Sequence, residues 1–148
     1  MADIRASRSS RIGAAAQTVY AILADYRQGH PSILPRAFTN LHVERGGYGD
    51  GTAIRFDVHL LGAHRTVHAE ITEPEPGRVL AEQDTETGAR TTFTVTPLSE
   101  TSCEVTIVTE WTAPGVRGLL ARLLGPPVLE RIYRQELDNL RRVASQAR

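Results

Sequence analysis

The chain has 148 residues and one cysteine, and its 17 lysine and arginine residues balance its 17 aspartate and glutamate residues. The balanced charge gives no indication of broad electrostatic attraction to nucleic acid or anionic membrane, so we expect no nucleic-acid partner. One cysteine excludes an internal disulfide and a multi-cysteine metal site. The length suits one domain with a sizeable core, which we place at residues 1–148.

The predicted elements begin with an edge strand. Residues Ile4 to Ile12 alternate small or apolar side chains with arginine and serine, as an edge strand does. From Ala14 to Tyr26 the apolar side chains recur at helical spacing instead. The glycine and prolines that follow end regular structure and leave a short turn or helix through Ser32-Ile33-Leu34.

Six more strands are predicted downstream, separated by glycine, proline or polar turns. They are Phe38–Arg45, Thr52–Leu61, His64–Thr72, Arg78–Gln83, Ala89–Thr96 and Cys103–Thr112. The chain closes with a helix that we expect to break at Gly125-Pro126-Pro127, because proline removes a backbone donor and clashes with the preceding turn. We find no segment apolar enough to span a bilayer and no apolar core of a secretion signal, so we expect a cytoplasmic protein without an integral membrane segment.

Two hairpins have a register that side-chain chemistry predicts. A two-residue turn at Gly62-Ala63 places Asp57 opposite His68 and Arg55 opposite Glu70, with apolar pairs on the other face. The second hairpin gives the pairs Phe93–Ile107, Val95–Val105 and Arg90–Glu110. Both registers predict an antiparallel sheet with one apolar face, which the apolar stripe of the closing helix would cover. A curved sheet around one helix leaves a gap, and we expect the ligand site there.

The order of these elements resembles the helix-grip superfamily, which includes START domains, Bet v 1-like allergens and polyketide cyclase/dehydrase-like proteins and is often called SRPBCC. The resemblance covers essentially the whole chain and is greatest to the bacterial polyketide cyclase/dehydrase-like branch. The segments that carry it are 4–26, 46–52, 73–78 and 137–142. It implies an α+β helix-grip fold, in which a curved antiparallel sheet of about seven strands wraps around a long C-terminal helix, with two short helices after strand 1. It also implies an internal cavity for a hydrophobic molecule, but no single chemistry.

Glu136 is the residue of the closing helix that bears most directly on function. It lies within about 30° of the centre of the apolar stripe on a helical wheel. A buried carboxylate needs a partner, a proton or a wet cavity. Either it pairs with backbone donors or an arginine, Arg65 being a possible partner, or it lines the cavity and hydrogen-bonds a ligand or moves a proton.

Three other residues have two interpretations each. Tyr133 shares the face of Glu136 and either fills the core or presents its hydroxyl to a ligand. His30, where the first helices end, is either a proton shuttle or a solvated loop histidine. Trp111 either lines the mouth of the cavity or anchors the corner before the closing helix.

A metal site has little support in the sequence. His59, His64 and His68 are near one another in the chain, but the predicted register places them out of step, and Asp57 is the one acidic residue near them. We therefore expect no metal and no cofactor.

We predict a protein that binds a hydrophobic small molecule, lipid- or polyketide-like, between the sheet and the closing helix. The predicted ligand-binding residues are Phe56, Val58, Val67, Phe93, Val95, Ile107, Thr109, Trp111, Ile132, Tyr133, Glu136 and Leu140. One alternative is a cyclase or dehydratase in which Glu136, with Tyr133 or His30, supplies general acid–base catalysis. Another is a protein- or membrane-interaction module formed by the leucines of residues 119–124, although packing of these leucines on the edge of the sheet is the favoured interpretation. The sequence indicates no particular oligomeric state.

Overall fold

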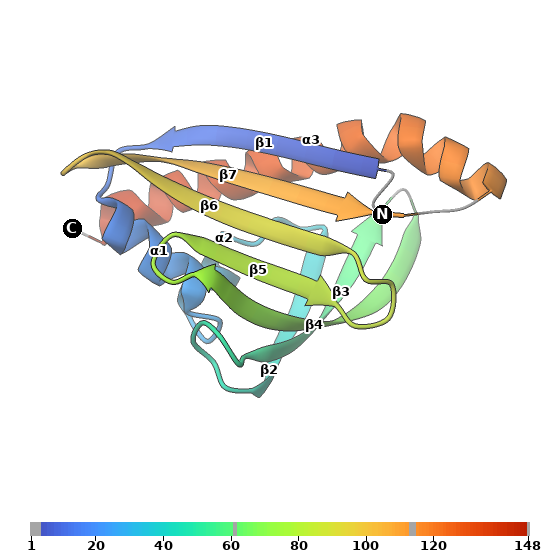
Figure 1. Cartoon of the computed structure of the whole chain (residues 1–148), viewed down its shortest axis with the longest axis horizontal. Coiled ribbons are helices and arrows are strands. Elements are labelled where there is room, and N and C mark those ends of the chain that lie inside the picture. The colour runs from blue at the N-terminus through green and yellow to red at the C-terminus, as the bar shows by residue number, and fades with distance from the viewer. Residues whose placement is uncertain (1–3, 61, 113–114, 148) are drawn as a thin grey trace.

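The computed structural model describes residues 4–60, 62–112 and 115–147, and for residues 115–124 it describes the backbone alone. Within these ranges the chain forms seven strands and three helices (Figure 1). In chain order they are β1 (Ile4–Ile12), α1 (Ala16–Ala24), α2 (Gly29–Ile33), β2 (Phe38–Arg45), β3 (Ala53–Leu60), β4 (Ala63–Glu75), β5 (Val79–Asp84), β6 (Arg90–Ser99), β7 (Ser102–Trp111) and α3 (Gly115–Gln146). This order confirms the predicted sequence of elements.

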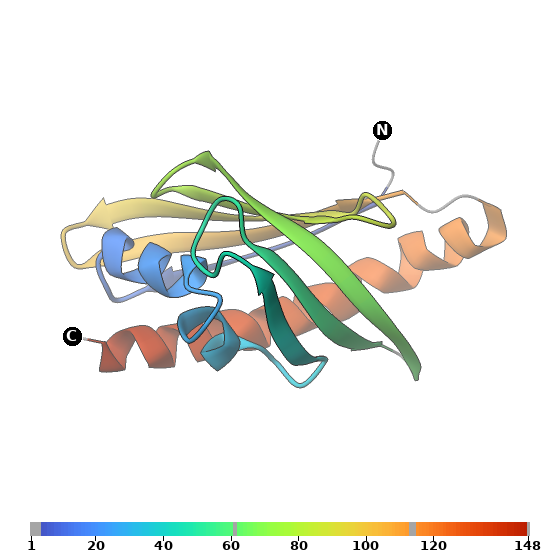
Figure 2. The same cartoon turned by 90° about the horizontal axis from the view of Figure 1, so that it is seen from below.

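The strands form one antiparallel sheet in the order β1-β7-β6-β5-β4-β3-β2. Figure 2 shows α3 running along one face of this twisted sheet, with α1 and α2 beside its C-terminal half. The apolar stripe of α3 is buried against that face, as Leu137, Leu140 and Ala144 show. The fold is the helix-grip arrangement that the resemblance implied.

The predicted register is confirmed in one hairpin and wrong in the other. Phe93 lies opposite Ile107 and Val95 opposite Val105, as expected. In the β3–β4 hairpin the turn comes one residue earlier, because Ala63 already pairs with Leu60. Gly62 then takes the second turn position with φ +80°, a conformation that favours glycine.

The earlier turn moves the β3–β4 pairing by two residues. Arg55 lies opposite His68 and Asp57 opposite Thr66, so the predicted Arg55–Glu70 and Asp57–His68 pairs do not form. Asp57 instead accepts a hydrogen bond from the Thr66 hydroxyl at 2.8 Å. A shift of two keeps every side chain on its predicted face, because the strand repeat is two residues.

The closing helix does not break at its two prolines. Pro126 and Pro127 lie inside α3, which is continuous from Gly115 to Gln146. A prolyl ring fixes φ near the helical value, and Gly125 lacks the Cβ that would crowd the ring after it. A Cβ on Gly125 would also lie 3.0 Å from Cζ2 of Trp111, so a glycine suits this crossing.

The predicted edge strand β1 does end the sheet, and α3 contacts its free side. The backbone N–H of Ser7 donates to Glu130 at 3.2 Å. At the other end of the strand, Arg141 donates to the carbonyl oxygen of Arg11 at 3.1 Å. Two side chains of one helix therefore hold the outer edge of the sheet.

Candidate functional site

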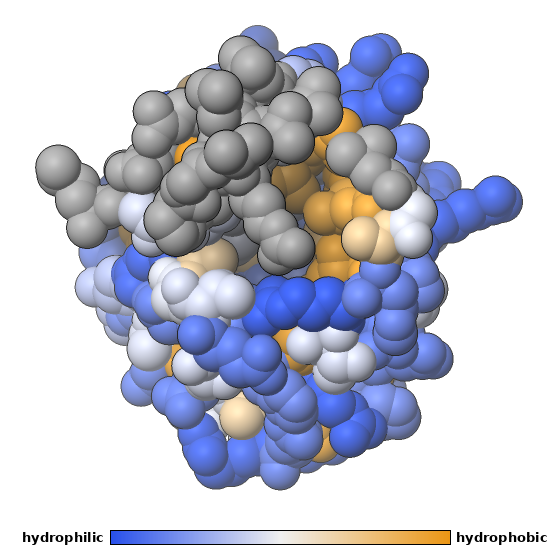
Figure 3. Space-filling model, turned by 90° about the vertical axis from the view of Figure 1, so that its right-hand side faces the viewer, coloured by the Kyte–Doolittle hydropathy of each residue, from blue (hydrophilic) through white to orange (hydrophobic). Residues whose placement is uncertain are grey.

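A cavity of about 490 Å³ lies between the inner face of the sheet and α3. Its walls are mainly apolar side chains of β3, β4, β6 and α3. Seen from the right-hand side of Figure 1, hydrophobic side chains gather around a recess in the surface (Figure 3). The predicted residues that line this cavity are Phe56, Val58, Val67, Phe93, Thr109, Trp111, Tyr133 and Glu136.

Four predicted ligand-binding residues lie elsewhere. Val95, Ile107, Ile132 and Leu140 are buried in the core between the sheet and α3, outside the lining of the cavity. These four side chains lie on the same inward faces of the strands and of α3 as the lining residues. They fill the core there, because each face extends beyond the cavity. The structure supports the interpretation that Trp111 lines the cavity. Its ring also lies close to Gly125 on α3.

Glu136 lines the cavity and is buried, with only 2% of the surface of the residue exposed. The suggested partner, Arg65, is wrong: its Nη1 lies 2.9 Å from Asp84 Oδ2, near the β3–β4 hairpin. Glu136 instead lies beside His30, with 3.8 Å between Oε2 and Nε2. Burial, and then the charge of Glu82, raise the pKa of Glu136 well above its ordinary value and favour the neutral acid.

His30 is buried, so the interpretation as a solvated loop histidine is wrong. Only 2% of its surface is exposed, and its ring stacks on Tyr26 with centroids 4.5 Å apart. Nδ1 lies 2.7 Å from the carbonyl oxygen of Leu23. A carbonyl only accepts, so Nδ1 carries the hydrogen, and Nε2 is the nitrogen that can gain or lose a proton.

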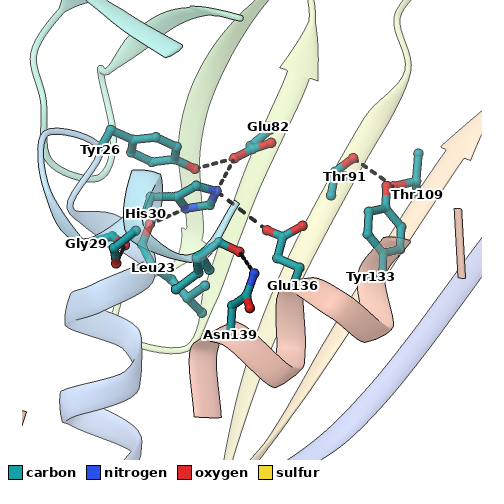
Figure 4. A network of polar contacts seen from close by, with 12 residues as sticks. Leu23, Tyr26, Gly29, His30, Glu82, Thr91, Thr109, Tyr133, Glu136 and Asn139 are labelled. Atoms are coloured by element: carbon teal, nitrogen blue, oxygen red, sulfur yellow. Dashed lines mark hydrogen bonds and ion pairs between the residues drawn. The ribbon is translucent and has the colours of Figure 1, made fainter. Parts of the chain in front are cut away.

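Nε2 of His30 faces two carboxyl groups (Figure 4). It is 3.5 Å from Glu82 Oε2 and 3.8 Å from Glu136 Oε2. The hydroxyl of Tyr26, which is fully buried, donates to the same Glu82 oxygen at 2.6 Å. Burial, and then the charge of Glu82, raise the pKa of Tyr26 well above its ordinary value, so Tyr26 remains a donor. We call Tyr26, His30, Glu82 and Glu136 the acid–histidine cluster.

The turn between α1 and α2 places His30. The Asp25 carboxylate accepts the backbone N–H groups of Arg27 and Gln28, and the Asp25 carbonyl accepts that of His30 at 2.7 Å. A Cβ on Gly29 would lie 2.4 Å from the carbonyl oxygen of Ile22, so glycine is needed for α2 to pack this close to α1. Local turn chemistry and one glycine therefore bring the imidazole to the cavity.

A chain of hydroxyl groups lies beside the cluster on the cavity wall. The Tyr133 hydroxyl hydrogen-bonds to Thr109, whose Oγ1 lies 2.8 Å from that of Thr91 (Figure 4). Burial raises the pKa of Tyr133, which keeps its hydroxyl protonated. Tyr133 is buried, as a core-filling residue is, and it also lines the cavity, so contact of its hydroxyl with a ligand stays a prediction.

The site also contains polar residues that the sequence analysis missed, namely Arg65 as a wall residue, Glu82, Asp84 and Thr91. Burial would raise the pKa of Asp84, but hydrogen bonds from Arg65 and from the backbone of residues 86 and 87 outweigh it and lower that pKa. The alternation of side chains along β5 could have revealed two of these residues. Leu80, Glu82 and Asp84 share one face of the strand, and the apolar Leu80 indicates that this is the inner face.

The remaining hypotheses concern metal and membranes. Among the residues that the structure describes, we find no group of three histidine, cysteine or acidic side chains placed to hold a metal ion. Nor does any described helix combine the length and hydropathy that crossing a membrane requires. The leucines proposed as an interaction surface lie in residues 115–124, outside the described side chains.

The fold is that of a helix-grip protein with a mainly apolar cavity between the sheet and α3. The chain belongs to the family described as "Polyketide cyclase / dehydrase and lipid transport", whose model matches residues 3–145. Proteins of this family bind hydrophobic ligands or act as polyketide cyclases. A comparison with curated proteins finds no match.

Solved structures share the fold over nearly the whole chain. The KanY protein is 28% identical with a TM-score of 0.84, and the match covers 98% of this chain and 99% of that one. The Zhui aromatase/cyclase of Streptomyces sp. R1128 is 20% identical, with a TM-score of 0.78 and coverage of 96% and 93%. Norcoclaurine synthase of Thalictrum flavum, solved with dopamine and hydroxybenzaldehyde, is 16% identical, with a TM-score of 0.73 and coverage of 97% and 87%. The last two show likeness of fold alone.

Proposed function

We propose that this protein binds a hydrophobic small molecule, lipid- or polyketide-like, in the cavity between the sheet and α3. The observation that carries the proposal is a mainly apolar cavity of about 490 Å³ with a few polar groups gathered on its wall. Small-molecule sites combine these two features, and this volume lies within their usual range. Apolar wall contacts supply most of the affinity, because they remove ligand surface from water.

The polar groups orient the ligand. His30, Glu82 and Glu136 of the acid–histidine cluster lie together on the wall. Tyr133, on the same helix as Glu136, also lines the cavity. A ligand with one polar group is therefore held with that group toward the cluster and its apolar part toward Phe56 and Val58.

The binding test uses a neutral fluorescent dye, N-phenyl-naphthylamine, whose emission rises in apolar surroundings. Ala69 is buried on β4 and lines the cavity, so Ala69→Trp fills the cavity with an indole ring. We expect the wild-type protein to bind the dye and Ala69→Trp to lose at least about tenfold in affinity. Leu98→Trp, at an exposed position on β6, is the matched control and should bind as the wild type does.

Circular dichroism and thermal unfolding show whether both variants are folded. Equal dye binding by the folded Ala69→Trp variant would place the dye outside the cavity and remove the support for the proposal. Native mass spectrometry of protein purified from its own host supplies an independent measurement, in which a retained small molecule supports binding.

A second candidate function is general acid–base catalysis on a bound carbonyl compound, of the cyclase or dehydratase kind. His30 favours it, because its tautomer is fixed at Nδ1 and its Nε2 faces both Glu82 and Glu136. Aldol and dehydration steps need a base to remove a proton beside a carbonyl and an acid to protonate the departing oxygen. The protein of Streptomyces that shares the fold carries the name aromatase/cyclase.

Diacetylacetone, a small triketone, tests this second function. Its ring closure and dehydration give orcinol and one water, which liquid chromatography with mass spectrometry detects. We expect Glu136→Gln and His30→Gln each to slow turnover by about a hundredfold. Tyr48→Phe, at an exposed position, is the control. Failure of the wild-type protein to exceed the uncatalysed rate, or unchanged turnover in both variants, would count against catalysis of this reaction.

A further inference from the structure

The wall of the cavity carries more acid than base. Its described ionisable side chains include three carboxyl groups, Glu82, Asp84 and Glu136, against one guanidinium, Arg65, and one imidazole, His30. With all three acids ionised, the wall is negative whether His30 is neutral or protonated. The composition of the whole chain hides this imbalance, because its formal net charge is zero.

The single guanidinium is already paired. Nη1 of Arg65 lies 2.9 Å from Asp84 Oδ2, and Nη2 lies 3.7 Å from Glu86 Oε2. With 42% of its side chain exposed, Arg65 sits at the solvent side of the cavity. The two carboxyl groups of the wall without a guanidinium partner are therefore Glu82 and Glu136, which share one histidine between them.

Acceptor atoms are in excess at the same place. One oxygen of Glu82 accepts the Tyr26 hydroxyl, while the contact of Glu136 with His30 is 3.8 Å, too long for a hydrogen bond. Carboxylate oxygens only accept, so a ligand that donates several hydrogen bonds and carries positive charge suits them. An ammonium group has three donors and a full positive charge.

We propose that the ligand is a hydrophobic amine, whose ammonium group binds between Glu82 and Glu136 while its apolar part fills the cavity. The proposal rests on the proposed binding function and names the class of its ligand. A carboxylate ligand of the same shape would meet like charge in a site that is shielded from water, where repulsion is strong. A neutral alcohol brings no positive charge to stabilise the ionised forms of Glu82 and Glu136.

Binding of the amine should release a proton. In the empty cavity Glu136 favours its neutral form, and an ammonium beside it favours the ionised form. The groups that face Glu136 are Glu82 on β5, His30 on α2, and two tyrosines, Tyr26 and Tyr133, whose raised pKa values keep them neutral. The released proton therefore comes from the acid–histidine cluster, and an uncharged ligand should release none.

Isothermal titration of the full chain with three probes tests the proposal. Naphthylethylamine, naphthylethanol and naphthylacetate share one ring system and differ in charge. At neutral pH we expect the amine to bind at least about tenfold more tightly than the alcohol, and the acetate to bind most weakly. Titration in buffers with different ionisation enthalpies should show proton release for the amine alone.

Variants assign the effect to the two acids. Glu136→Gln should bring the affinity for the amine to within about threefold of that for the alcohol, and it should remove the proton release. Asp138→Asn, which removes an exposed charge from the same helix, should change none of these values. Glu82→Gln is the second variant, and it should also reduce the preference for the amine over the alcohol. Where a variant does not fold, the order of the affinities of the wild-type protein for the three probes still tests the proposal.

The outcomes separate this inference from the function on which it rests. If the alcohol binds and the amine binds no more tightly, or if the acetate binds best, the proposal of an amine ligand is overturned. The proposed binding of a hydrophobic molecule then still stands. If the wild-type protein binds none of the three probes and does not bind the neutral dye, the binding function fails as well.

Discussion

Replacing Glu136 by glutamine should change how the stability of the protein depends on pH. The folded state raises the pKa of this buried carboxyl group above its ordinary value of 4.5, first by burial and then by the charge of Glu82. The folded protein therefore holds the proton more tightly than the unfolded chain does. The stabilisation is fully present below about pH 4.5 and is lost as the pH rises toward the raised folded-state pKa.

The size of the effect follows from this linkage. Within that window the wild-type protein loses up to about 1.4 kcal/mol of unfolding free energy for each pH unit through Glu136 alone. Glutamine has nearly the same shape and carries no titrating proton, so Glu136→Gln lacks this loss. The variant should therefore gain stability relative to the wild type as the pH rises from about 5 toward neutral.

Urea unfolding of both proteins, at steps of about one pH unit, measures the difference directly. Asp138→Asn is the matched control, because Asp138 is exposed on the same helix, and its difference from the wild type should stay nearly constant. A constant difference for Glu136→Gln as well would mean that Glu136 titrates alike in the folded and unfolded states. That result would refute the argument from burial.

Three further substitutions test how the site is held. Tyr26→Phe removes the hydrogen bond to Glu82 and should lower the free energy of unfolding, measured with urea, by about 1.5–3 kcal/mol. A decrease below about 0.5 kcal/mol would show that water replaces the hydroxyl. Phe93→Ala should cost about 3–5 kcal/mol, because the ring is buried beside His30, and an unchanged midpoint would show that the cavity wall collapses without penalty. Gly29→Ala places a Cβ 2.4 Å from the Ile22 carbonyl oxygen, so it should lower the free energy of unfolding by about 1–3 kcal/mol and weaken binding of the neutral dye. Unchanged stability and unchanged dye binding would show that α2 can move away freely.

The alternation of side chains predicted most of the fold but could not set every register. The pairing of Phe93 with Ile107 followed from matching apolar and charged partners along two strands. In the β3–β4 hairpin a shift of two residues leaves each face unchanged, so face chemistry cannot distinguish the two registers. The position of Gly62 in the turn decides between them, and two turn types accept glycine at different positions.

The candidate site was predictable where one element determines it. Glu136 was predicted near the centre of the apolar stripe of α3, because helical periodicity is a local property. The burial of His30 depends on the packing of α2 against α1, β6 and α3, which no local pattern encodes. Glu82 was missed because a charged residue in a strand usually marks the solvent face, and here the inner face of β5 carries the charge.

The contacts between α3 and β1 bear on how the protein behaves at high concentration. An unprotected edge strand offers a row of free N–H and C=O groups to the strands of other molecules, which is a common route to aggregation. Glu130 and Arg141 occupy such groups at Ser7 and Arg11. The helix that forms one wall of the cavity thus also blocks intermolecular strand addition at this edge of the sheet. A substitution that weakens the packing of α3 on β1 should therefore favour self-association.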